Sequence, residues 1–122
     1  MTTTLDHINI RSHDPEGVRD SLVKLLKLEA GHRPAFSSQG YWLYGDGYPI
    51  VHLSKRDNDP GAGTGALDHV AFKDDDRDGL VERLNANGIA FDERIVPGSG
   101  VRQIFFLINH DIKVEVDFDP AD

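Results

Sequence analysis

Leu5-Asp6-His7-Ile8, near the start of the sequence, returns almost unchanged as Leu67-Asp68-His69-Val70 at the start of its second half. A second pair of segments follows in the same order, at a spacing longer by a single position: Ile50-Val51-His52-Leu53 and Lys113-Val114-Glu115-Val116. Similarity at a fixed spacing indicates an internal repeat. The sequence therefore predicts two copies of one module, each with a histidine near its start and a second polar residue near its end.

The composition is that of one acidic domain whose core needs no covalent crosslinks. A chain of 122 residues can bury such a core, and the absence of cysteine excludes disulfides and thiolate metal sites. The formal charge of −8 argues against nucleic acid as a partner. No apolar stretch is long enough for a membrane helix, and Met1-Thr2-Thr3-Thr4 has no features of a signal peptide. We therefore expect a cytoplasmic protein with no membrane partner.

The first half of the chain is predicted to contain one helix and four strands. Asp14-Pro15-Glu16 has the residues of a helix start: an N-cap residue, a proline at the first helical position and a carboxylate in the first turn. Apolar residues follow with helical spacing, and Gly45-Asp46-Gly47 predicts a turn between two strands. The predicted strands cover residues 4–11, 32–37, 40–45 and 49–54.

The second half is predicted to repeat this order. Residues 55–65 have no periodicity, and we interpret them as a linker. The acidic run from Asp74 to Asp76 is interpreted as the start of a helix that continues to about Asn87, with a cation site as the alternative. The predicted strands cover residues 67–73, 90–95, 101–108 and 112–118. The prediction is thus a single α+β domain over residues 1–122, with one βαβββ module at 4–54 and the other at 66–119.

Strand alternation places the four repeat-related polar residues on one face of the predicted sheets. Successive side chains of a strand point to opposite faces. The neighbours of these polar residues within the strands are mainly apolar, which suits the face that the helices cover. The same alternation puts Asp6 and Asp68 on the opposite face, so they are not predicted to be ligands. The residues predicted on the uncovered face are His7, His52, His69 and Glu115.

These four residues have the chemistry of a site for a divalent metal ion. A single histidine or glutamate in a strand is most often structural or exposed, and that interpretation stays open for each residue alone. Three imidazoles and one carboxylate at repeat-related positions suit borderline divalent cations, however. Polar groups buried without partners are costly, and a bound metal removes that cost. We therefore predict a metal site formed by all four.

At these residues the sequence resembles the vicinal oxygen chelate superfamily, which includes glyoxalases, bleomycin resistance proteins and extradiol dioxygenases. The resemblance covers nearly the whole chain. The LDH and VEV elements are typical of the superfamily but are shared by its different reactions. The segments that carry the resemblance are LDHINI at 5–10, GYWLYGDGYPIVHLS at 40–54, LDHVAF at 67–72 and QIFFLINHDIKVEVDF at 103–118.

The resemblance implies a glyoxalase-like fold, in which the paired modules form a cupped mixed sheet around a metal ion: Fe, Mn, Ni, Co or Zn. His7 and His52 match the ligand positions of the first module, and His69 and Glu115 match those of the second. The sequence departs from the usual pattern of the superfamily at two places. His52 stands where many glyoxalases have glutamate, and Asn109-His110-Asp111 lacks the proline and glycine usual before the last strand. Many relatives are homodimers with shared sites, so we expect a homodimer.

The resemblance implies three functions, and the sequence does not choose among them. The first is a metal-dependent lyase or isomerase acting on a small substrate that chelates the metal through two neighbouring oxygens. The second is an extradiol-type Fe(II) dioxygenase that cleaves a catechol, because two histidines and one carboxylate form the ligand set associated with that chemistry. The third is a small-molecule binding or resistance protein without catalysis.

Three further residues are candidate substrate contacts. Trp42 and Phe105 could line an aromatic pocket, although core packing is the alternative for both. Gln103, which precedes a phenylalanine-rich strand, is the third. No general base is assigned; Glu29, Glu93 and His52 are the residues that could act as one.

Overall fold

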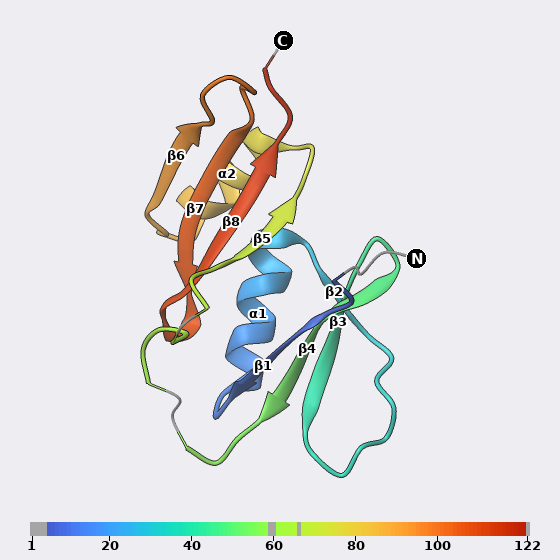
Figure 1. Cartoon of the computed structure of the whole chain (residues 1–122). Helices are drawn as coiled ribbons and strands as arrows, with labels where there is room; N and C mark the ends of the chain where they lie inside the picture. Colours follow the sequence, from blue (N-terminus) through green and yellow to red (C-terminus); the bar gives the residue numbers. More distant parts are fainter. Residues whose placement is uncertain (1–4, 59–60, 66, 122) are drawn as a thin grey trace. The chain divides into compact units, whose positions relative to one another are not determined.

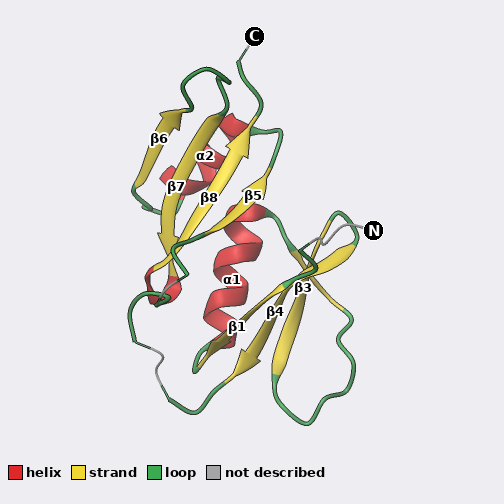
Figure 2. Cartoon of the chain, viewed as in Figure 1, coloured by secondary structure: helices red, strands yellow, loops and turns green. Residues whose placement is uncertain are grey.

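The computed structural model describes residues 5–58, 61–65 and 67–121, and the chain divides into two compact units, Met1–Pro60 and Gly61–Asp122 (Figure 1). The boundary falls inside residues 55–65, the segment interpreted as a linker. Each unit is one βαβββ module, with its helix following its first strand (Figure 2). The two-module α+β fold predicted from the repeat is confirmed.

The first unit contains one mixed four-stranded sheet. Its strands lie in the order β1-β4-β3-β2, with β1 parallel to β4 and the other neighbours antiparallel. The turn at Asp46 and Gly47, where both residues have positive φ, joins β3 to β4. The elements are β1 (Ile8–Ser12), α1 (Pro15–Leu26), β2 (Glu29–Gly31), β3 (Gly40–Gly45) and β4 (Tyr48–Lys55).

The second unit repeats this sheet. Its strands lie in the order β5-β8-β7-β6, again with the first and last strands parallel. A short 3₁₀ turn, η1 (Asn109–Asp111), joins β7 to β8, and its His110 and Asp111 have positive φ. The other elements are β5 (Val70–Lys73), α2 (Arg77–Ala86), β6 (Phe91–Ile95), β7 (Arg102–Ile108) and β8 (Ile112–Phe118).

Strand register confirms the repeat residue by residue. Trp42 lies opposite His52 in the first sheet, and Phe105 lies opposite Glu115 in the second. Both pairs follow the spacing between the two halves that the sequence predicted. His52 and Glu115 therefore occupy equivalent places, each between an aromatic residue on one neighbouring strand and a first-strand residue on the other.

The core of each unit lies on the helix-covered face of its sheet. Val51 is fully buried next to His52, as is Val114 next to Glu115, as strand alternation predicted. Burying such side chains contributes about 1.5–3 kcal/mol each. The helices supply the facing layer, and Figure 1 shows α2 against one face of the second sheet. Their fully or almost fully buried side chains are Val18, Leu22, Leu25, Leu80 and Leu84.

One predicted strand, at residues 32–37, is wrong. The strand at this place is β2, which ends at Gly31, and the chain then forms a loop as far as β3. Pro34 has no N–H to donate to a sheet ladder, which explains why the strand does not continue. Arg33 instead donates a hydrogen bond to the carbonyl of Ser38 (2.9 Å), which closes the loop.

Both helices begin with a capping aspartate, as the sequence predicted. The Asp14 side chain accepts a hydrogen bond from the backbone N–H of Gly17 (3.1 Å), and Asp76 does the same for Gly79 (3.0 Å). We expect Asp14→Ala to lower the free energy of unfolding by about 1 kcal/mol, because one N–H of the first turn loses its acceptor. Urea denaturation measures this loss. Asp14→Asn is the control and should cost clearly less; equal losses would show that the cap hydrogen bond is not the cause.

An ion pair ties α2 to the outer strand of its sheet. The Arg77 guanidinium donates two hydrogen bonds to the carboxylate of Glu93, one of them 2.8 Å long, and both side chains are 29% exposed. This pairing lowers the pKa of Glu93 below its ordinary value. Glu93 lies opposite the buried Ile104, so its side chain shares the helix-covered face. It is therefore not on the face of Glu115, and we no longer consider it as a general base.

The Arg77–Glu93 pair predicts a pH-dependent stability difference. At pH 7, Glu93→Gln should lower the free energy of unfolding by about 0.5–1.5 kcal/mol. A carboxyl group whose pKa is depressed by folding stabilises the protein above its unfolded pKa, and this contribution is lost as the pH falls through the folded pKa. The difference between the wild type and Glu93→Gln should thus shrink below about pH 4.5. Denaturation at a series of pH values checks this, and a difference that stays constant down to pH 3 would contradict it.

Neither helix of the described residues is long and apolar enough to cross a membrane.

Candidate metal centre

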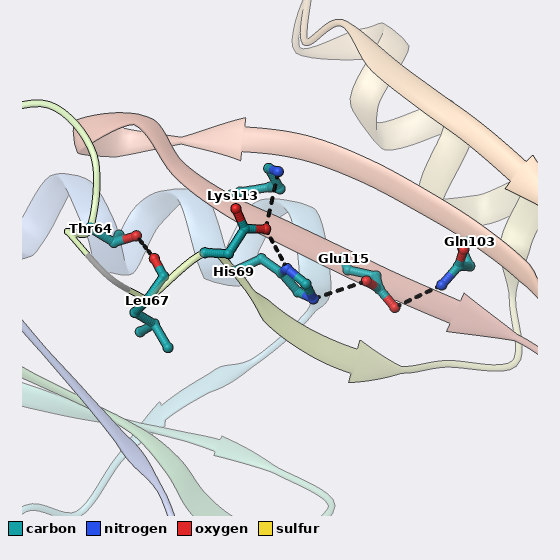
Figure 3. A network of polar contacts seen from close by, with 7 residues as sticks. Thr64, Leu67, His69, Gln103, Lys113 and Glu115 are labelled. Carbon is teal, nitrogen blue, oxygen red and sulfur yellow. Dashed lines mark hydrogen bonds and ion pairs between the residues drawn. The ribbon is translucent and has the colours of Figure 1, made fainter.

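The second unit brings its two predicted ligands into direct contact (Figure 3). His69 Nε2 lies 3.2 Å from Glu115 Oε1. His69 comes directly before β5, which begins later than the predicted strand that contained it, and Glu115 is in the middle of β8. Glu115 is only 6% exposed, whereas the His69 side chain is 37% exposed. The pair is therefore a buried carboxylate with a histidine on its solvent side.

Two of the predicted substrate contacts lie beside this pair. The Gln103 Nε2 amide donates a hydrogen bond to Glu115 Oε2 (3.2 Å), so this carboxylate is held from the side opposite His69 (Figure 3). Phe105 meets the His69 ring edge to face, with centroids 6.4 Å apart. The Arg94 guanidinium lies over the Phe105 ring, 5.2 Å from its centroid. Gln103 thus contacts Glu115, and Phe105 contacts His69.

The surroundings of Glu115 disfavour its charged form. Burial is the main cause that raises the pKa of Glu115, and the hydrogen bond and negative charge of Asp117 raise it further. His69 and the Gln103 hydrogen bond act in the opposite direction but do not cancel this. A buried carboxylate in such a place gains from a nearby cation.

The first unit stacks its two predicted ligands. The rings of His7 and His52 are parallel within 12°, with centroids 3.8 Å apart, and Trp42 stacks on His52 at 4.2 Å. Burial lowers the pKa of His52, and the neighbouring His7 lowers it further. Both effects favour the neutral form of His52, the form in which an imidazole can bind a metal.

Each candidate histidine that follows an aspartate also contacts it. Asp6 Oδ2 lies 2.7 Å from His7 Nδ1, and Asp68 Oδ2 lies 2.8 Å from His69 Nδ1. Strand alternation predicted that these aspartates point away, and that prediction is wrong. The reason is that both residues precede β1 and β5, so the alternation of a strand does not apply to them.

The donor set of the second unit fits a divalent metal ion. Neutral imidazole nitrogen and carboxylate oxygen are ligands of borderline divalent metals. With metal–ligand bonds of about 2.1 Å, two donors at a right angle lie about 3 Å apart, close to the separation of His69 Nε2 and Glu115 Oε1. Among the described residues, no group of three or more His, Asp and Glu side chains is placed to hold a metal ion. Each unit by itself brings two of the four predicted ligands into contact.

The fold of the chain is similar to that of several solved structures. A mutant of FosX, a fosfomycin resistance protein from Listeria monocytogenes in complex with Mn(II) and 1S,2S-dihydroxypropylphosphonic acid, gives a TM-score of 0.76 at 19% identity, over 99% of this chain and 95% of that chain. A glyoxylase/bleomycin resistance protein/dioxygenase domain from Frankia sp. EAN1pec gives 0.81 at 18% identity, over 98% and 99%. A glyoxalase family protein from Enterococcus faecalis gives 0.70 at 20% identity, over 93% and 96%. No protein-family model and no curated protein matches the sequence.

These similarities extend over nearly the whole chain and show that it has the glyoxalase-like fold. The fold implied by the LDH and VEV segments is therefore confirmed. One of the similar proteins was crystallised with a divalent metal and a small oxygen-rich molecule. At such low identity the likeness concerns the fold, and the activity has to be argued from the side chains of this chain.

Proposed function

We propose that the chain is a metal-dependent, glyoxalase-like lyase or isomerase that acts on a small substrate with two neighbouring oxygens. The proposed ligands of the divalent metal are His7, His52, His69 and Glu115. The observation that carries the proposal is the 3.2 Å contact between His69 Nε2 and the buried Glu115 Oε1. Both atoms carry lone pairs, so a metal ion or a proton between them would stabilise their contact.

Three properties of the site favour a metal ion over a proton as its resident cation. His69 is well exposed, so an ion can reach the pair from solvent. Both units bring two of the proposed ligands into contact at repeat-related positions, His69 with Glu115 and His7 with His52, which a simple internal hydrogen bond would not require. The glyoxalase-like FosX structure also contains Mn(II). A structural His69–Glu115 ion pair is the competing interpretation, and metal titration separates the two.

When bound, the metal would act as a Lewis acid on a chelating carbonyl or alkoxide oxygen of the substrate. Three neutral imidazoles and one carboxylate would leave the divalent centre with a net charge of about +1, which favours an anionic, oxygen-rich substrate. The Gln103 amide fixes the Glu115 carboxylate, so one of its oxygens stays directed at His69. Trp42 covers one face of His52 and keeps water from that ring. No residue is assigned as the general base.

We further propose that the protein is a homodimer in which sites are shared between subunits. Separately inactive His52→Ala and Glu115→Ala proteins should then regain activity on mixing, because one type of site in the mixed dimer would carry all its ligands. Light scattering gives the oligomeric state. If mixed dimers form but activity does not return, shared sites are excluded.

Two other functions are supported by specific observations. The fold similarity to FosX, solved with a dihydroxypropylphosphonic acid, supports a phosphonate-directed resistance function. The presence of two histidines and one carboxylate among the proposed ligands supports an extradiol-type dioxygenase, if His52 does not bind the metal. A non-catalytic binding protein ranks below these because the complete predicted ligand set is present.

Metal reconstitution combined with substrate screening tests these functions. The protein should be freed of metal, reloaded separately with Mn(II), Ni(II), Co(II), Zn(II) or Fe(II), and assayed with hemithioacetals, 2-substituted malonyl thioesters, fosfomycin and catechols. Isomerisation or lyase turnover without oxygen uptake is the expected result. Oxygen consumption with a catechol and Fe(II) would overturn the lyase or isomerase proposal in favour of the dioxygenase. Loss of fosfomycin would instead favour the resistance function.

A further inference from the structure

In each unit, an aspartate adjacent in sequence holds the Nδ1 side of a proposed metal ligand. We propose that Asp6 and Asp68 are positioning residues that fix His7 and His69 as Nδ1–H tautomers, leaving Nε2 as the metal-binding atom. The part concerning metal rests on the proposed function. The part concerning the tautomer stands on the metal-free protein alone.

The hydrogen-bond chemistry determines where the imidazole proton lies. The two Nδ1–carboxylate distances, 2.7 Å for Asp6 and 2.8 Å for Asp68, are those of short charge-assisted hydrogen bonds. An ionised carboxylate can only accept, so Nδ1 must donate. A neutral imidazole has a single N–H, and Nε2 of each ring is therefore left with a free lone pair.

Each aspartate also accepts a hydrogen bond from a second donor. The Tyr48 hydroxyl donates a hydrogen bond to Asp6 Oδ1, and Lys113 Nζ donates to Asp68 Oδ2 (3.2 Å). A carboxylate that accepts two hydrogen bonds is favoured in its ionised form.

The second donors do not come from equivalent positions of the repeat. Tyr48 is at the start of β4, whereas Lys113 is near the start of β8, at the position that the repeat makes equivalent to Ile50. The two units thus reach the same Asp–His arrangement with different partners.

The second unit shows what the aspartate prevents. If His69 carried its proton on Nε2, that proton would be donated to Glu115 Oε1, 3.2 Å away. Such a hydrogen bond would occupy both proposed ligand atoms and would have to break before a metal could bind. Asp68 draws the proton to Nδ1 instead, the ring nitrogen that does not face Glu115. Carboxylate partners of metal-binding histidines typically change metal affinity by about 10–100-fold.

The test uses the full chain with Asp68→Ala, Asp6→Ala and the control Asp92→Ala. Asp92 is another exposed aspartate of the second unit, paired only loosely with Arg94 at 3.7 Å. Long-range ¹H–¹⁵N correlation spectra of the metal-free proteins at pH 9 report the tautomer of each histidine. Wild type and Asp92→Ala should show His7 and His69 as Nδ1–H. Asp68→Ala should shift only His69 towards Nε2–H, and Asp6→Ala only His7.

Mn(II) affinity, measured from the electron paramagnetic resonance signal of free Mn(II), is the second readout. Asp6→Ala and Asp68→Ala should each weaken binding by about 10–100-fold, and Asp92→Ala should not change it. Nε2–H histidines in the wild type would overturn the inference whatever the metal result. Altered tautomers with unchanged Mn(II) affinity would overturn the positioning role alone. Nδ1–H tautomers in a wild type that binds no metal would refute the proposed function and the positioning role with it, but not the tautomer assignment.

Discussion

Replacing Glu115 with alanine is expected to weaken Mn(II) binding by at least about 100-fold. Carboxylates that only support a metal ligand change affinity by about 10–100-fold, and removing a ligand itself should exceed this. Glu115 is also the single anionic residue of the proposed set, so its loss leaves three neutral imidazoles to hold a dication. Calorimetric titration of the metal-free wild type and of metal-free Glu115→Ala with Mn(II) gives the dissociation constant of each protein.

The metal-free stability of Glu115→Ala separates this explanation from misfolding. Glu115 is 6% exposed, and the desolvation of its carboxylate raises its pKa. Without metal such a group contributes little stability or none, so Glu115→Ala should unfold at a denaturant concentration equal to or above that of the wild type. The exposed Glu82 of α2 provides the matched control, Glu82→Ala, which should bind Mn(II) as the wild type does. Binding within about threefold of wild type in Glu115→Ala would remove Glu115 from the site.

Replacing Ile104 with alanine is expected to lower the free energy of unfolding by about 2–5 kcal/mol. Ile104 is fully buried in β7, where it faces the helix side of the sheet, and its truncation removes apolar contacts and leaves a cavity. The loss is a large part of the stability expected for a small domain. Urea denaturation followed by circular dichroism measures it.

Leu107 gives the matched control on the same strand. It lies further along β7, on the opposite face, and is 50% exposed. Leu107→Ala makes a similar change in side-chain size and in strand propensity, so it should cost less than about 1 kcal/mol. Similar losses for both variants would contradict the assignment of the two faces, on which the placement of Glu115 depends.

The sequence predicted most of the fold because its two halves report on each other. The repeat pairs Trp42 with Phe105 and His52 with Glu115 at one common spacing. In the structure Trp42 is the cross-strand neighbour of His52, as Phe105 is of Glu115. When the two copies agree, a strand and the face of each residue can be assigned with support that the periodicity of one short strand does not give. The predicted strand at 32–37 was wrong because local composition did not show where the strand ends, and Pro34 cannot donate a hydrogen bond to a sheet ladder.

The sequence singled out residues that the structure brings into contact within each unit, but it did not predict their supporting contacts. Gln103 and Phe105 were selected as substrate contacts, and the structure places them against Glu115 and His69. Tyr48 and Lys113 were missed as partners of the aspartates. Their contacts join residues that are far apart in the sequence, and no local pattern encodes such a contact. The LDH repeat did contain one signal for these contacts, because an aspartate directly precedes each of the two histidines.

The most direct test of the central claim is the stoichiometry of metal binding by the wild-type protein. Metal-free protein should be titrated with Mn(II) and, in parallel, Zn(II), and the bound metal counted after dialysis by inductively coupled plasma mass spectrometry. We expect about one ion per chain, because each chain contains one complete set of His7, His52, His69 and Glu115. The same measurement on His69→Ala and Glu115→Ala should give clearly less than one. A wild-type protein that retains far less than one ion per chain with every divalent metal offered would contradict the metal centre and the enzyme function proposed from it.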